Sequence, residues 1–138
     1  MHSCHASRIF SLQRRAVRII AGLGYRDDVR QSFIDLRILT LPCRYIYECL
    51  LYCHGNQERY ICNGSNHSYP TRQWNSIRPT FLRLEKSRIS VNYYAPLFNN
   101  KLPNEYKLLA ENLFKVKMKD FLTRGAFYSI AEFSQWNF

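Results

Sequence analysis

The segment from Ser7 to Gly24, SRIFSLQRRAVRIIAGLG, constrains the fold most, because its apolar residues recur at helical spacing. At about 100° per residue, one stripe of a helix collects Ile9, Leu12, Ala16, Ile19, Ile20 and Leu23. The opposite side collects four arginines, Arg8, Arg14, Arg15 and Arg18. We expect Ser7 to cap this helix and Gly22 with Gly24 to end it, and we expect its apolar stripe to pack against the following helices. The sequence thus predicts an amphipathic helix with a guanidinium face.

Helical patterns continue on both sides of a less regular middle. VRQSFIDLRI predicts a short helix whose inward residues are Val29, Phe33 and Leu36. LTLPCRYIYECLLYCHGN predicts a longer one that starts near Pro42, ends at Gly55 and buries Tyr45, Ile46, Cys49, Leu50 and Cys53. In the last third, Pro103 is expected to open one helix. Asn112 is expected to cap the next, which ends at Gly125 and buries Leu113, Met118, Phe121 and Leu122. Ser129 and Glu132 have capping-box spacing before a short terminal helix.

The middle of the chain loses this periodicity. Gly64, Pro70 and Pro79 lie among Asn and Ser, which is typical of extended chain or loop. We therefore predict one all-α domain, a small irregular helical bundle with a long, loosely structured middle loop. Its expected parts are basic N-terminal helices (1–54), a loop or extended linker (55–92) and C-terminal helices (93–138).

Charge indicates the class of partner. Twenty Lys and Arg against ten Asp and Glu leave a formal charge of +10, which favours a polyanion such as nucleic acid or an anionic membrane surface. No apolar run is long enough to cross a membrane, and the start lacks a signal-peptide core, so we expect an intracellular protein, nuclear or cytoplasmic. The five cysteines are an odd number, which indicates reduced thiols.

Two groups of residues are candidates for binding RNA or single-stranded DNA. The arginine face of the first helix can neutralise phosphates. In the loop, charge alternates with aromatic rings that suit stacking on unpaired bases, and the strongest candidates are Tyr69, Arg72 and Trp74. The competing interpretation is that the arginines are solvated and the rings packed. The first helix has two further alternatives, which are to lie on a membrane or to dock into a groove of a partner.

Residues 25–28, Tyr-Arg-Asp-Asp, match the Tyr-x-Asp-Asp signature of a reverse transcriptase active site. Nucleotidyl transfer needs carboxylates that hold two divalent metals, supplied in polymerases by a strand hairpin and a further aspartate. Here the motif lies between two helical patterns, so we expect Asp27 and Asp28 to cap the second helix. No residue is expected to be catalytic.

The cysteines and histidines invite comparison with a zinc site. The candidates, Cys49, Cys53, His54, Cys62 and His67, are spaced unlike any compact zinc motif. Cys49 and Cys53 share the inward stripe of their helix, and free cysteine often behaves as a small buried hydrophobe. We therefore expect core packing, with no metal site and no cofactor.

Several motifs occur in an order that is known from one family. They are IFSLQRRAVRIIAGLG, LRILTLPCRYIYECLLYC, HSYPTR, APLFNNKLPNEYK and FKVKMKDFLTRGAFYSIAEF. From about Ser7 to Phe133, the chain resembles the segment that follows the polymerase domain in jockey-like non-LTR retrotransposon proteins. The resemblance implies a parent RNA-directed DNA polymerase, usually with an endonuclease, whose catalytic aspartate pair lies upstream of this segment.

The expected function is therefore that of a non-catalytic C-terminal fragment of such a polyprotein, which assists binding of template RNA or target DNA. One alternative is a purely structural module that packs on the upstream polymerase domain and exposes an apolar patch when isolated. Others are a non-functional truncated remnant and a zinc-stabilised module.

Overall fold

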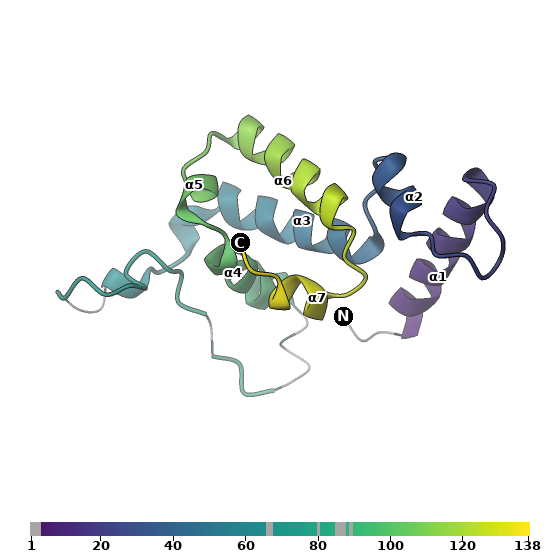
Figure 1. Cartoon of the computed structure of the whole chain (residues 1–138). Coiled ribbons are helices and arrows are strands. Elements are labelled where there is room, and N and C mark those ends of the chain that lie inside the picture. The colour runs from purple at the N-terminus through teal and green to yellow at the C-terminus, as the bar shows by residue number, and fades with distance from the viewer. Residues whose placement is uncertain (1–3, 66–67, 80, 85–87, 89) are drawn as a thin grey trace. The chain divides into compact units, whose positions relative to one another are not determined.

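The computed structural model describes residues 4–65, 68–79, 81–84, 88 and 90–138. Within these ranges the fold is all-α, as the sequence predicts, with seven α-helices and no strand (Figure 1). The helices are α1 (Cys4–Ile20), α2 (Arg30–Asp35), α3 (Leu41–Gly55), α4 (Val91–Lys101), α5 (Asn104–Lys107), α6 (Glu111–Gly125) and α7 (Ile130–Gln135). Two 3-10 turns, η1 (Gln57–Arg59) and η2 (Asn63–Ser65), follow α3. None of the described helices combines the length and the apolar character needed to cross a membrane.

Two compact units share the chain. The first unit comprises Met1–Tyr47 and Lys115–Asn137, and the second comprises Glu48–Phe114 with Phe138. The helices α3 and α6 are each divided between the two units, with one end in the first and the other end in the second.

The core of the first unit forms around α2. Val17, Val29, Phe33 and Ala126 are buried together, and Phe10, Ile34, Ile38 and Tyr128 pack against them. The ring of Phe10 meets that of Tyr128 edge-on, with centroids 5.2 Å apart, and lies 6.5 Å from that of Phe33. The helix α1 therefore joins this core through Phe10 and Val17.

This packing corrects the prediction for the apolar stripe of α1. Ile9, Leu12, Ile19 and Ile20 are between 54% and 72% exposed, and Leu23 and Ala16 are exposed as well. The buried face is rotated from the stripe by roughly 100° around the helix. The reason is tertiary: Phe10 inserts beside Phe33 and Tyr128, and this contact selects the face that α1 buries.

The ends of α1 also differ in part from expectation. The helix begins at Cys4, so Ser7 lies inside it and is not its cap. Its end is confirmed, because Gly22 adopts φ +68° and the backbone N–H of Leu23 donates to the carbonyl of Arg18 (2.9 Å). This six-to-one hydrogen bond with a left-handed glycine is a Schellman motif.

Two polar side chains hold the start of α3. The hydroxyl of Thr40, which is fully buried, accepts the N–H of Cys43 (3.3 Å) and donates to the carbonyl of Phe127. The carboxamide of Gln13 accepts the N–H of Leu41 and donates to the carbonyl of Leu39, both at 2.9 Å. These bonds satisfy N–H groups that have no partner within the helix.

Several inward positions are confirmed and others are wrong. Ile46, Cys49, Leu50, Cys53, Met118 and Leu122 are buried as predicted. Leu36 is 42% exposed, because α2 ends at Asp35 and the positive φ of Arg37 turns Ile38 inward instead. Leu113 is also exposed, since α6 begins at Glu111, includes Asn112 and buries Phe114.

The capping box of α7 is confirmed. The hydroxyl of Ser129 accepts the N–H of Glu132 (3.1 Å), and the carboxylate of Glu132 accepts the N–H of Tyr128 (3.0 Å). The same carboxylate pairs with Arg30 at 3.2 Å.

In the second unit, the middle segment is attached to α4 through Ile77. Cys62 and Ile77 form an antiparallel bridge. The carboxamide of Asn100, on α4, accepts the N–H of Ile77 (2.8 Å) and donates to its carbonyl (2.7 Å). The sequence did not predict α4, which contains Pro96. Elsewhere in the second unit, the ring of His54, in α3, stacks on that of Phe114, in α6, with centroids 4.1 Å apart.

Candidate nucleic-acid interface

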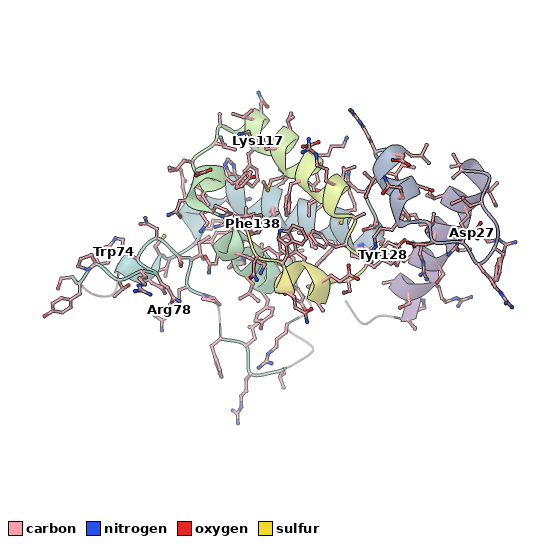
Figure 2. The ribbon with its side chains drawn as sticks, viewed as in Figure 1. Asp27, Trp74, Arg78, Lys117, Tyr128 and Phe138 are labelled. Carbon is pink, nitrogen blue, oxygen red and sulfur yellow. The ribbon has the colours of Figure 1, made fainter. Side chains whose placement is uncertain are left out.

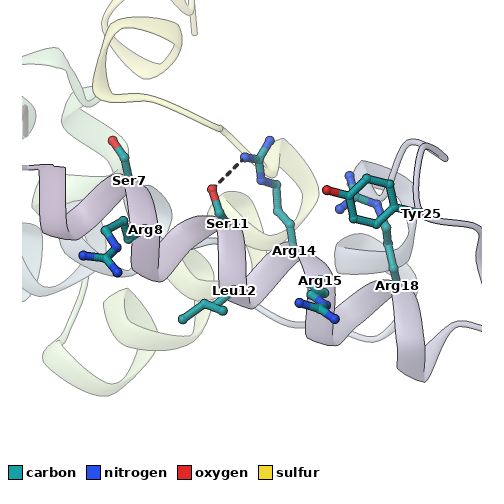
Figure 3. Close-up of a pocket in the computed structure, with 8 residues that line it drawn as sticks. All are labelled: Ser7, Arg8, Ser11, Leu12, Arg14, Arg15, Arg18 and Tyr25. Atoms are coloured by element: carbon teal, nitrogen blue, oxygen red, sulfur yellow. Dashed lines mark hydrogen bonds between the residues drawn. The ribbon is translucent and has the colours of Figure 1, made fainter.

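The four arginines predicted on the first helix line one open groove in the first unit (Figure 3). The groove has a volume of about 650 Å³, and its other lining residues are Ser7, Ser11, Leu12 and Tyr25. No acidic residue occurs in α1. The predicted cluster of guanidinium groups is therefore gathered along a single helix.

Arg8 and Arg15 are more available to a ligand than Arg14 and Arg18. Both are exposed, and within the described part of the chain neither makes a hydrogen bond or an ion pair. They lie seven residues apart, hence two turns along the same side, with Leu12 between them (Figure 3). Their charges are open to an anionic ligand.

Arg14 and Arg18 already have partners. The guanidinium of Arg14 lies 4.9 Å from the ring centroid of Phe10 and 5.9 Å from that of Tyr128, and it donates to Ser11 (3.3 Å). The Nε of Arg18 donates to the backbone carbonyl of Asp27 (2.9 Å). Both charges still face the groove, but each side chain also makes contacts within the first unit.

The Tyr-Arg-Asp-Asp segment lies in the turns between α1 and α2, where Figure 2 labels Asp27. The carboxylate of Asp27 accepts the N–H of Gly24 (2.7 Å), and that of Asp28 accepts the N–H of Arg30 (3.2 Å). The N-cap of α2 is Val29, which makes no side-chain cap bond. The capping prediction is therefore wrong for Asp27, which closes a preceding turn. For Asp28 it holds only in the sense that an acid satisfies the first N–H of the helix.

The loop candidates belong to the second unit. Tyr69 is 77% exposed and Arg72 is also exposed. Trp74 is half-buried and its indole lies on Gly64, where an added Cβ would come within 2.4 Å of the ring. The carbonyl of Trp74 also accepts the N–H of Gly64 (3.0 Å). Trp74, labelled in Figure 2, therefore has a packing role in the loop, and its stacking on a base stays a prediction.

The chain matches no family model and has no significant match among the curated proteins or the solved structures. Its functional interpretation therefore depends on the charges, exposures and contacts of its own residues.

The cysteines behave as the sequence predicts at Cys49 and Cys53, which are buried in α3 with Cys43. All five cysteines are free thiols, and Cys4 and Cys62 are exposed. Burial raises the pKa of Cys53 to about 12, so that thiol stays neutral and unreactive at neutral pH. Among the described residues no three His, Cys, Asp or Glu side chains are grouped to hold a metal ion; His67, one of the residues considered above, lies outside them.

Sequence reasoning missed the polar residues that shape this region. Gln13 looked like part of the polar side of a helix, yet it joins α1 to the start of α3. Thr40 precedes Leu-Pro, a position where a capping hydroxyl is common, and this signal was available. The contact of Arg14 with Tyr128 joins residues far apart in the chain, and no local pattern reports it.

Proposed function

We propose that this chain is a non-catalytic nucleic-acid-binding module that grips the phosphates of RNA or single-stranded DNA through α1. The observation that supports this most directly is that Arg8 and Arg15 are exposed and have no partner among the described residues, in a groove that Arg14 and Arg18 also line. A cationic groove with no acid on its helix attracts a phosphate backbone and releases counterions on binding.

The four arginines have two different roles in this proposal. Arg8 and Arg15 have long side chains that pair with none of the residues the structure describes, so they contact phosphate directly. Arg14 and Arg18 are held by Phe10 and by the carbonyl of Asp27, so they supply fixed positive charge beside the strand. Tyr25 lines the same groove and is 83% exposed, which suits stacking on an unpaired base.

In the second unit, we propose a weaker contact. Tyr69 and Arg72 extend from the loop and would meet unpaired bases or phosphate. Trp74 would contribute less, because its ring already covers Gly64.

The resemblance to the post-polymerase segment of jockey-like retrotransposon proteins supports a more specific form of the proposal. The module would hold template RNA or target DNA for an upstream polymerase domain, inside the cell and in the nucleus at the time of insertion. It would contribute no catalytic residue and require no cofactor.

The test is a titration of the purified chain with labelled single-stranded RNA, single-stranded DNA and duplex DNA across a range of salt. With two to four phosphate contacts, the logarithm of the binding constant should fall with the logarithm of salt at a slope of about −1.4 to −2.8 for single strands. Absence of binding at low salt, or a slope near zero, would rule the proposal out.

A further inference from the structure

The apolar stripe of α1 is exposed, and the proposed binding of phosphate does not require it. Four large side chains, Ile9, Leu12, Ile19 and Ile20, are each more than half exposed on one face of the helix. Ala16, in the middle of the stripe, is exposed too and leaves room for a close neighbour. The stripe runs for about 16 Å along the helix axis. Single exposed apolar residues are ordinary, whereas large contiguous apolar patches often mark interaction surfaces.

The two edges of the stripe differ. Along one edge lie Arg8 and Arg15, both exposed and, among the described residues, without an acidic partner. Along the other edge lie Gln13 and Val17, which α1 uses to contact the rest of its own unit. One edge of the stripe is therefore cationic, and the other edge contacts the rest of the first unit.

We propose that this stripe docks an amphipathic helix of a partner protein. The partner helix carries its own Leu- or Ile-rich stripe and a row of Glu or Asp along one edge, opposite Arg8 and Arg15. Helices bury apolar stripes against each other in this way, and charges at the margin set partner choice and orientation. This surface goes beyond the proposed binding of nucleic acid, since it needs apolar contacts that a phosphate backbone does not make.

Charge favours such a helix over two other occupants. A second copy would bring another α1 without acids and a molecule of formal charge +10, so like charges would meet. An anionic membrane would place negative headgroups along both edges of the stripe, whereas only one edge is cationic.

The experiment uses the full chain and a synthetic helical peptide of about 18 residues, with a Leu stripe and Glu along one edge. A matched peptide carries Lys in place of each Glu. The test variant is Ile9→Gln with Ile19→Gln, and its control is Leu113→Gln with Val116→Gln, which alters two exposed apolar residues of α6. Circular dichroism checks that every variant remains folded, as expected for changes at exposed positions.

We expect the Glu peptide to bind the native chain and the control variant equally. Binding to the Ile9 and Ile19 variant should be at least about tenfold weaker, as should binding of the Lys peptide to the native chain. The proposal would be overturned if both peptides bound the native chain equally, or if the Glu peptide bound the stripe variant as tightly as the native chain. Absence of any binding of the Glu peptide would overturn it too.

Two parallel measurements distinguish the other occupants. Binding to vesicles of phosphatidylserine and phosphatidylcholine, or concentration-dependent self-association, would refute the helix partner if the stripe variant abolished it. Salt-dependent binding of oligonucleotides should persist in the stripe variant, because its arginines are intact. Arg8 and Arg15 serve both functions, so the stripe variant, which leaves them intact, is the variant that separates docking from nucleic-acid binding.

Discussion

Thr40 shows how much of the first unit depends on single polar side chains. Its hydroxyl caps α3 by accepting the N–H of Cys43 and also donates to the carbonyl of Phe127, 87 residues away in sequence. Because Thr40 is fully buried, water cannot replace either bond.

Replacing Thr40 with valine keeps the shape and removes the hydroxyl. The N–H of Cys43 and the carbonyl of Phe127 then lose a partner, so we expect the free energy of unfolding to fall by about 1–3 kcal/mol. Urea denaturation followed by circular dichroism measures this. The control is Thr71→Val at an exposed position, and equal effects of the two changes would refute the capping role.

From the burial of Cys53, we expect the protein to lose stability at alkaline pH. Its pKa is raised from 9.0 to about 12 by burial, so the folded state disfavours the thiolate while the unfolded chain ionises near 9. The contribution of this thiol to stability should therefore be constant below pH 9 and decline between pH 9 and 12, at a slope of up to about 1.4 kcal/mol per pH unit. Tyr60, whose pKa burial raises from 10.0 to about 12, acts in the same direction.

Denaturation curves at a series of pH values between 8 and 11 test this decline. Cys53→Ala should reduce its slope, whereas Cys62→Ala, at an exposed thiol, should leave the slope unchanged. An identical slope in both variants would contradict the assignment to Cys53.

At the scale of elements, the sequence predicted where α1 lies better than which side of it is buried. Periodicity located the stripe and the glycine that ends the helix, because both are local properties. The choice of buried face depends on Phe33 and Tyr128, which pack on Phe10 from distant parts of the chain. The helix α4 was missed because Pro96 interrupts its pattern, although the helix continues through it.

The attachment of the middle segment to α4 gives a test at this scale. Asn100→Ala removes both bonds to the backbone of Ile77, so the amide of Ile77 should exchange with solvent at least about tenfold faster. Hydrogen exchange followed by nuclear magnetic resonance measures this rate. Asn92→Ala, at an exposed site on the same helix, should leave it unchanged. An unaltered rate in the Asn100 variant would show that other contacts hold the segment.

For the whole molecule, composition and periodicity were enough to predict an all-α fold and a cationic helix. Four arginines predicted from spacing do line one groove. The sequence could not separate Arg8 and Arg15 from Arg14 and Arg18, because that difference arises from Phe10, Tyr128 and the turn at Asp27.

Net charge alone would also attract nucleic acid, so the central claim concerns the position of the charges. Lys117 and Lys119 provide the comparison, since both are exposed on α6, where Figure 2 labels Lys117. Arg8→Gln with Arg15→Gln and Lys117→Gln with Lys119→Gln each remove two positive charges.

The decisive measurement is the salt dependence of binding to one labelled single-stranded oligonucleotide by these two double variants and the native chain. If Arg8 and Arg15 each contact a phosphate, their loss should make the slope shallower by about 1.4, and the lysine variant should change it by less than half as much. Equal changes in the two variants, or an unchanged slope without Arg8 and Arg15, would contradict a binding site on α1.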